Sequence, residues 1–133
     1  MDSNLPRPMS PEVERLASLI VDSALTVHKT LGPGLFESIY EPCLCHELGK
    51  RGVSLRRQVV VPLVYDTLKF EEGLRIDVLV ADQIICEIKA VETILPVHQA
   101  QLLTYMKLTQ KRLGFLINFN VPLIKNGIKR LAL

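Results

Sequence analysis

Two carboxylates and a lysine interrupt the most apolar stretch of the chain. Asp77 stands within the run 74–80, and Glu87 and Lys89 stand within the run 84–89. Glu87 and Lys89 are two residues apart, so they share one face if their run is a strand. Burying a carboxylate in a sheet is costly unless a cation pairs with it. The trio therefore indicates a divalent-metal site, and a structural ion-pair network is the alternative interpretation.

The two runs are separated by Ala81, Asp82 and Gln83, which favour a turn, so together they predict a β-hairpin. Asp77 shares a face with Glu87 only if the residue numbers of each cross-strand pair sum to an even number. A three-residue loop gives such pairs, for example 77 opposite 87. A shift of one residue would turn Asp77 to the opposite face. We therefore predict a loop of odd length, or a bulge that restores the parity.

The composition is that of a folded protein. The chain has 133 residues, of which 48% are apolar and 23% charged. This length predicts one domain, which we place at residues 10–133. Residues 1–9 contain two prolines and little that could pack, so we expect a flexible N-terminal arm.

The net charge of +2 permits nucleic-acid binding without arguing for it, because strong electrostatic binding needs clustered Lys and Arg. No apolar run approaches the roughly 18 residues that a transmembrane helix needs, and the first residues lack the apolar core of a signal peptide. The three cysteines fit a reducing compartment. We therefore expect a cytoplasmic protein without a membrane partner.

Two helices are predicted at the start of the domain. Ser10 is a candidate N-cap, and apolar residues at steps of three and four predict a helix from there to about Thr30. A second helix runs to about Lys50. It starts either near Ser38, with Ser38 and Glu41 as a capping box, or earlier with a kink at Pro42.

The remaining segments predict a mixed sheet. Residues 59–65 form a strand and 66–73 a connection that could contain a short extension of that strand, and the hairpin follows. A third helix covers about 98–108, with Leu102, Leu103 and Met106 toward the sheet. Strands at 112–118 and 128–131 complete the chain. This order predicts an α/β fold in which an antiparallel meander is followed by a helical crossover to a parallel strand.

This order, with an aspartate followed ten residues later by Glu-x-Lys and then a helix, resembles the PD-(D/E)xK nuclease superfamily. The similarity covers about residues 14–131 and implies a restriction-endonuclease-like core, a mixed sheet flanked by helices. More narrowly, the chain resembles the GxxExxY family, small prokaryotic proteins assigned to that superfamily. The motifs that carry this resemblance are Gly34-x-x-Glu37-x-x-Tyr40, Arg75-x-Asp77, Glu87-Ile-Lys89-Ala, Gln101-Leu-Leu-x-Tyr105, Asn118-Phe and Gly127-Ile-Lys-Arg130.

The resemblance implies a metal site and assigns its ligands. Asp77 and Glu87 would be the metal-binding carboxylates, and the backbone carbonyl of Ile88 would complete the protein ligands. The implied cofactor is Mg²⁺ or Mn²⁺, because Mg²⁺ prefers oxygen ligands and retains waters. Ile76 stands where the superfamily pattern has proline, which leaves the carboxylate chemistry of Asp77 unchanged.

The same resemblance implies three catalytic residues. Lys89 would orient or deprotonate the attacking water and offset charge at the phosphate. Glu37 would reach the metal through water, and Gln101 would contact Lys89 or the substrate. Glu37 could instead favour the start of its helix through the helix dipole.

Tyr40, Arg75 and Tyr105 are the candidate substrate-binding residues. Tyr40 and Tyr105 have a second interpretation, as half-buried packing residues whose hydroxyls bond to nearby groups. The implied activity is metal-dependent hydrolysis of phosphodiester bonds in DNA or RNA. The alternative is a non-catalytic module that binds nucleic acid or protein with a degenerate nuclease fold. Either protein could be a homodimer, because a core of this size would often need a second copy to embrace a duplex.

Overall fold

The structure is a computed structural model that describes residues 7–133. Most of the expected N-terminal arm, residues 1–6, lies outside the described residues. Met9, at the end of that segment, packs against the core. Among residues 7–133, no helix is both long enough and apolar enough to cross a membrane.

The elements follow the predicted order of two helices, three strands, one helix and two strands. A short 3₁₀ helix, η1 (Ile124–Asn126), precedes the last strand. The helices are α1 (Pro11–Leu31), α2 (Glu37–Lys50) and α3 (Pro96–Thr109). The strands are β1 (Leu55–Tyr65), β2 (Leu68–Val80), β3 (Ile84–Lys89), β4 (Leu113–Asn118) and β5 (Ile128–Ala132).

The five strands form one mixed sheet in the order β1-β2-β3-β4-β5. The pairs β1/β2, β2/β3 and β4/β5 are antiparallel, and β3/β4 is parallel. Helix α3 supplies the crossover between the two parallel strands, because it is the element that connects β3 to β4. The predicted fold class is therefore confirmed: an α/β structure with a restriction-endonuclease-like core.

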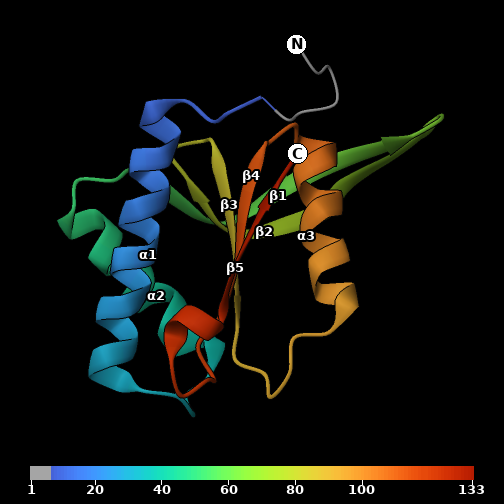
Figure 1. Cartoon of the computed structure of the whole chain (residues 1–133). Coiled ribbons are helices and arrows are strands. Elements are labelled where there is room, and N and C mark those ends of the chain that lie inside the picture. The colour runs from blue at the N-terminus through green and yellow to red at the C-terminus, as the bar shows by residue number, and fades with distance from the viewer. Residues whose placement is uncertain (1–6) are drawn as a thin grey trace.

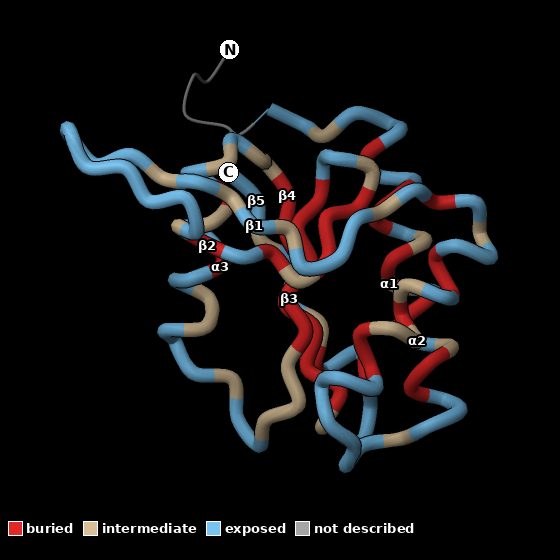
Figure 2. The backbone as a smooth tube through the Cα atoms, turned by 180° about the vertical axis from the view of Figure 1, so that it is seen from behind, coloured by how far each residue is buried: buried red, intermediate tan, exposed pale blue. Residues whose placement is uncertain are grey.

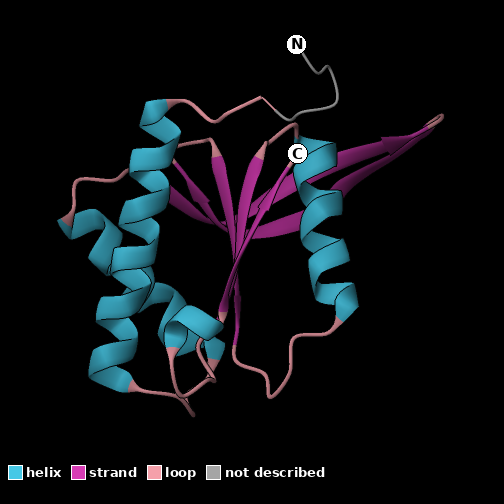
Figure 3. Ribbon diagram, in the orientation of Figure 1, coloured by secondary structure: helices cyan, strands magenta, loops and turns pink. Residues whose placement is uncertain are grey.

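Helices cover both faces of this sheet (Figures 1 and 3). One core cluster joins α1 and α2 to side chains such as Val78, Cys86 and Ile117. A second joins Leu102 and Met106 of α3 to Leu79 and Leu116 on the other face. The buried residues lie mainly in the central strands and on the inward faces of α1 and α2 (Figure 2). Leu103 is exposed, so its predicted contact with the sheet is wrong.

The β1–β2 hairpin is longer than the sequence predicted. Strand β2 begins at Leu68, and the segment expected to be a connection pairs with β1 as far as Tyr65↔Leu68. This part projects beyond α3 as a two-stranded arm (Figure 1). The β2 side chains from Leu68 to Glu72 are exposed on both faces, so this part of β2 lacks the alternation that marks a half-buried strand. Strand β1 keeps it, with Val59, Val61 and Leu63 half-buried.

Helix α2 begins at Glu37 and contains Pro42. The N-cap residue, Phe36, makes no side-chain capping bond, so the capping box expected from Ser38 and Glu41 is wrong. Glu41 instead binds residues of β1 that are 16 and 17 positions away in the sequence. The long-range ion pair has replaced the local capping contact.

Candidate active site

The site forms where β2 separates from β3. The ladder between these strands contains only Val80↔Ile84, Leu79↔Ile85 and Val78↔Cys86. Strand β3 continues beyond that point beside β4, as far as Lys89↔Asn118. The loop between β2 and β3 is residues 81–83, so the predicted odd length and even parity are confirmed. If this pairing is continued by one residue, Asp77 lies opposite Glu87. We call the point where β2 and β3 separate the fork.

Asp77 lies just beyond the last paired residues of β2 and β3, Val78 and Cys86. Its Oδ2 accepts a hydrogen bond from the backbone N–H of Ile88 at 2.9 Å. The N–H and C=O of one strand residue point toward the same neighbouring strand, so the Ile88 carbonyl also faces the Asp77 side of β3. A carboxylate and a backbone carbonyl therefore lie on the same side of the fork.

Glu87 is 5% exposed, and its Oε1 has no hydrogen-bond partner in the part of the chain that the structure describes. The pKa of Glu87 is raised to about 9, mainly by burial. Hydrogen bonding to the Asp77 carboxyl and repulsion from its charge contribute to the rise, while Lys89 opposes it. Without a bound cation, the Glu87 carboxyl is thus protonated at neutral pH. A buried carboxyl oxygen without a partner, next to a second carboxylate, is suited to binding a cation.

Lys89 of β3 and Glu37 of α2 both lie near the fork. Lys89 is half-buried at the end of β3, two residues after Glu87 and on the same face. Glu37 is the first residue of α2, and its Oε1 accepts from the backbone N–H of Ala90 at 3.2 Å. This bond ties the start of α2 to the residue that follows Lys89.

Gln101 and Tyr105 approach the site from α3. The Gln101 amide Nε2 donates to the Tyr105 hydroxyl at 3.2 Å. Burial raises the pKa of Tyr105, and the charge of Glu87 adds to the rise, because this carboxyl is close to the phenol. The structure therefore brings both side chains toward the face of the sheet that carries Glu87.

Tyr40 lies elsewhere. Its side chain is fully buried and stacks on Phe119, with ring centroids 4.5 Å apart. Its hydroxyl donates to the carbonyl of Gly32 at 2.6 Å and accepts from the N–H of Leu35 at 3.1 Å. Both bonds hold the loop that leads into Glu37, so Tyr40 supports the site from the core and has no free group for a substrate.

We predict that Tyr40→Phe lowers the free energy of unfolding by about 1 kcal/mol, because the backbone groups of Gly32 and Leu35 lose their partner while the ring stack remains. Urea denaturation measures this change. Tyr65→Phe is the control, since Tyr65 is 75% exposed on the β1–β2 arm and should change stability little. Equal effects of the two substitutions would contradict the role given to the Tyr40 hydroxyl.

A hollow of about 560 Å³ opens beside Asp77. Arg75, the third candidate for substrate binding, is exposed there two residues before Asp77 on β2. Sequence reasoning missed Glu41, Arg57 and Gln58 as part of this site, because their contacts join α2 to β1. The hollow is lined by Glu37, Ser38, Glu41, Arg57, Gln58, Arg75 and Asp77.

Asn118 is a second residue whose structural role the sequence did not reveal. It is buried beside Lys89 in the parallel ladder. Its Oδ1 accepts from the N–H groups of Val91 at 3.0 Å and Asn120 at 3.2 Å, and its Nδ2 donates to the Val91 carbonyl at 2.9 Å. One amide thus holds the chain where it leaves β3, directly after Lys89.

We predict that Asn118→Ala lowers the free energy of unfolding by about 2 kcal/mol, because it leaves backbone groups of Val91 and Asn120 without partners. Chemical denaturation of the variant measures this cost. In Asn120→Ala the backbone N–H that binds Asn118 remains, so this control should lose much less stability. A loss as small as that of the control would show that Asn118 does not hold this turn.

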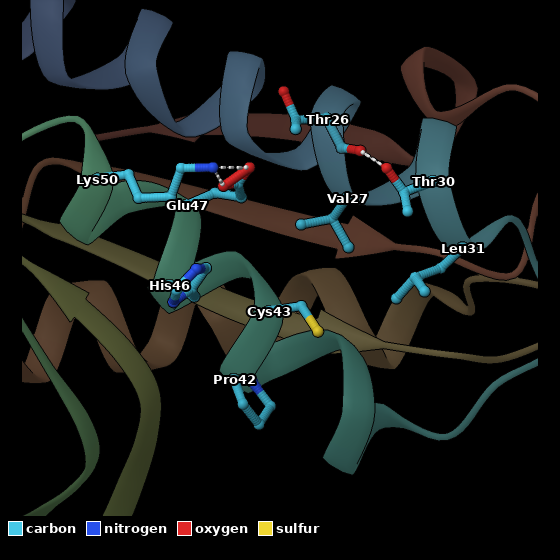
Figure 4. A pocket seen from close by; sticks show the side chains of 9 residues that line it. All are labelled: Thr26, Val27, Thr30, Leu31, Pro42, Cys43, His46, Glu47 and Lys50. Atoms are coloured by element: carbon cyan, nitrogen blue, oxygen red, sulfur yellow. Dashed lines mark hydrogen bonds and ion pairs between the residues drawn. The ribbon is translucent and has the colours of Figure 1, made fainter.

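A second hollow, of about 480 Å³, lies away from the fork between α1 and α2 (Figure 4). Its lining includes Cys43 and His46 and the ion pair between Lys50 and Glu47 at 3.0 Å. Burial raises the pKa of the neighbouring Cys45 thiol to about 11, so this thiol stays neutral. Glu47 is the one carboxylate that lines this hollow, and Lys50 pairs with it, whereas two carboxylates meet at the fork; the fork therefore remains the candidate site.

A family model described as the PD-(D/E)XK nuclease superfamily matches residues 14–131. The chain belongs to the PD-(D/E)XK nuclease superfamily. No curated protein and no solved structure matches the chain. The superfamily match covers every strand of the sheet except the last residue of β5, and it includes the whole fork between β2 and β3. The family and the fold therefore agree, and they support a nuclease-like function in general terms.

Nucleases of the PD-(D/E)XK superfamily generally use divalent metal ions. Among residues 7–133, no group of three His, Cys, Asp or Glu side chains converges as a metal cluster. Two carboxylates do converge, and the Ile88 carbonyl faces their side of β3. Such a sparse set of oxygen donors suits Mg²⁺, which usually keeps several waters and takes only one or two carboxylates. The residues present therefore fit the cofactor that the superfamily implies.

Proposed function

We propose that this chain hydrolyses phosphodiester bonds in DNA or RNA with a divalent cation, Mg²⁺ or Mn²⁺, and that it belongs to the GxxExxY group of its superfamily. The observation that carries the proposal is the pair formed by Asp77 and Glu87 at the fork. The register sets them opposite each other, and Glu87 is buried with one oxygen free of hydrogen bonds. A buried carboxyl without a partner is costly for a purely structural role.

Asp77, Glu87 and the Ile88 carbonyl would hold the cation. When bound, it would supply Lewis-acid stabilisation of the phosphate and a lower pKa for a water molecule. The protein contributes the alignment of these ligands, because the Ile88 N–H fixes the orientation of the Asp77 carboxylate. The raised pKa of Glu87 means that its carboxyl must lose a proton before it can bind the cation.

Lys89 carries the charge that the reacting phosphate requires. Its ammonium group lies on the same face as Glu87, where it can donate to a phosphate oxygen and orient the attacking water. The Asn118 amide holds the backbone directly after Lys89, so the lysine stands on a fixed support. Glu37 and Gln101 flank the same region from α2 and α3 and can align water or substrate.

Arg75 and Tyr105 are the proposed substrate contacts. Arg75 is exposed at the hollow beside Asp77, where a guanidinium group can pair with a backbone phosphate. The Tyr105 hydroxyl bonds to Gln101 and can donate to substrate on the α3 side. We leave Tyr40 out of this set, because both of its hydroxyl contacts are to backbone groups of its own loop.

A nuclease panel tests the proposal. The purified protein is incubated with single-stranded and duplex DNA and RNA, with Mg²⁺, Mn²⁺ or EDTA. We expect cleavage of at least one substrate with either metal, none in EDTA, and none with Asp77→Asn under any condition. Cleavage that is retained by Asp77→Asn would point to a contaminating enzyme. Binding without cleavage in all metals would instead favour the non-catalytic module.

A further inference from the structure

A chain of side-chain contacts lines the hollow beside Asp77, and the proposed chemistry uses only its last member, Arg75. Glu41 of α2 is 7% exposed and accepts three hydrogen bonds. Its Oε2 accepts from Nε and Nη2 of Arg57 at 3.1 and 2.8 Å, and its Oε1 accepts from the Gln58 amide at 2.8 Å. A buried carboxylate on α2 thus holds two consecutive side chains of β1.

Gln58 extends this chain to the strand that carries Asp77. Its Oε1 accepts from Nη1 of Arg75 at 3.5 Å, so one amide bridges Glu41 and Arg75. The φ angle of Gln58 is 51°, a left-handed conformation that is uncommon for a residue with a side chain. Such conformations persist where surrounding contacts hold them, and they cluster at functional sites. The contact with Glu41 is one that holds this residue.

Both arginines retain hydrogen-bond donors for a ligand. The Arg57 side chain is 44% exposed, and its bonds to Glu41 leave Nη1 without a partner among residues 7–133. Arg75 is exposed, and its contact with Gln58 uses only Nη1. A guanidinium group presents its N–H donors in one plane, in a geometry that matches two oxygens of a phosphate. The contacts with Glu41 and Gln58 restrict both side chains before any ligand arrives, which lowers the entropic cost of binding.

The position of the two arginines indicates which phosphate they could take. Arg75 lies two residues from Asp77 on β2, and both line the hollow together with Arg57. Neither Glu87 nor Lys89 lines the hollow, so Asp77 is the residue that joins it to the fork. A strand whose scissile phosphate lies at the carboxylate pair can extend past Asp77 and place its next phosphate there. Three carboxylates, those of Glu37, Glu41 and Asp77, line it against two guanidinium groups, so an anion can bind there only through direct hydrogen bonds to the arginines.

We propose that Arg57 and Arg75 bind the phosphate adjacent to the scissile one, and that Glu41 and Gln58 position the two guanidinium groups. This inference rests on the proposed function, because it places a phosphodiester at the fork. It adds the substrate class: a polynucleotide with a charged phosphate next to the cleaved linkage, in place of an isolated diester. Arg57 is then a binding residue, whereas Glu41 and Gln58 are positioning residues.

The first test measures binding, so it does not depend on cleavage. Fluorescence anisotropy gives the affinity for an oligothymidylate in EDTA over a range of salt concentrations. We expect Arg57→Ala to lower the slope of log affinity against log salt by about 0.7, the value for one phosphate contact on a single strand. Arg56→Ala is the matched control, since Arg56 is the adjacent residue and pairs with Asp82 at 3.2 Å, away from the hollow. Equal slopes for the two variants, or no binding by the wild type, would overturn the inference.

Loss of Arg57 leaves the Glu41 carboxylate buried without its cation, which could unfold the variant. The double variant Glu41→Gln/Arg57→Ala removes both charges, and its salt slope should fall by the same amount. Glu41→Gln alone tests the positioning role: Arg57 keeps its charge but loses its anchor. For this variant we expect a raised KM with kcat nearly unchanged, whereas a merely structural role would lower stability and leave KM as it is.

The second test measures cleavage of a trinucleotide in which the linkage beside the cleaved one is either charged or a neutral methylphosphonate. We expect the wild type to show about a tenfold higher KM for the neutral form, and Arg57→Ala to show no difference between the two. Cleavage without any effect of the neighbouring charge overturns the inference and leaves the proposed function intact. No cleavage of any substrate, together with the expected fall in salt slope, overturns the proposed function and retains the phosphate site.

Discussion

Replacing Lys89 by alanine is expected to lower the rate of phosphodiester hydrolysis by about 10³-fold while leaving the fold and the cation site in place. The Lys89 ammonium group is a positive charge that the protein itself contributes to the fork. The Asn118 amide binds the backbone of Val91, two residues further along the chain. Because the proposed role of Lys89 is to act on the reacting phosphate, its loss should appear mainly in kcat. Single-turnover cleavage of the best substrate from the panel measures this effect.

The matched control for Lys89→Ala is Lys29→Ala, since Lys29 is exposed in the last turn of α1 and lines neither hollow. Both variants should bind Mn²⁺ with the affinity of the wild type. A fall of less than tenfold in kcat for Lys89→Ala would remove this lysine from the catalytic set, even if metal-dependent cleavage remained.

Glu87→Gln is expected to stabilise the metal-free protein, by an amount that grows with pH. The folded state holds the pKa of Glu87 at about 9, well above its ordinary value of 4.5. Between those two pH values the unfolded chain is ionised and the folded one protonated, so the wild type loses stability as pH rises. Glutamine does not titrate, and its advantage over the wild type should increase by roughly 4 kcal/mol between pH 5 and pH 8.

Urea denaturation in EDTA at the two pH values measures this change. Glu71→Gln is the control, because Glu71 is exposed on the β1–β2 arm and should show no such trend. A constant difference between wild type and Glu87→Gln across this range would mean that the Glu87 carboxyl is ionised in the folded protein. Asp77 and Glu87 would then be an ordinary pair of solvated carboxylates.

The geometry of the fork could be predicted from the sequence because it follows from parity. The three residues between Val80 and Ile84 form the loop, and that odd count sets Asp77 and Glu87 opposite each other. The mixed sheet followed from similarly local signals, since an apolar strand, a helix and a further apolar strand favour a parallel crossover. These inferences depend on the spacing of neighbouring elements alone.

Long-range contacts account for what the sequence did not reveal. Tyr40 lies three positions after Glu37, which suggests a shared face, yet the loop at Gly32 folds back over its hydroxyl. Glu41 has the right spacing for a capping box with Ser38, but an arginine and a glutamine of β1 bind it instead. Such contacts depend on how α2 packs against β1, which no local pattern encodes.

The length of the β1–β2 hairpin was missed for a different reason. Residues 66–73 contain three carboxylates and no alternation of apolar and polar side chains, so they are typical of a connection. In the structure, Phe70 still pairs with Leu63, although the β2 side chains from Leu68 to Glu72 are exposed on both faces. A strand that buries neither face leaves no periodic signal in its sequence.

Calorimetric titration of Mn²⁺ into the metal-free protein tests the central claim most directly, because it reports a cation at Asp77 and Glu87 whether or not any substrate is cleaved. At pH 7.5, in two buffers of different ionisation enthalpy, we predict binding of about one cation with release of about one proton, since the Glu87 carboxyl must ionise to bind it. Asp77→Asn and Glu87→Gln should each abolish the heat. Binding that is unchanged in both variants, or no binding by the wild type, would contradict a metal site at the fork.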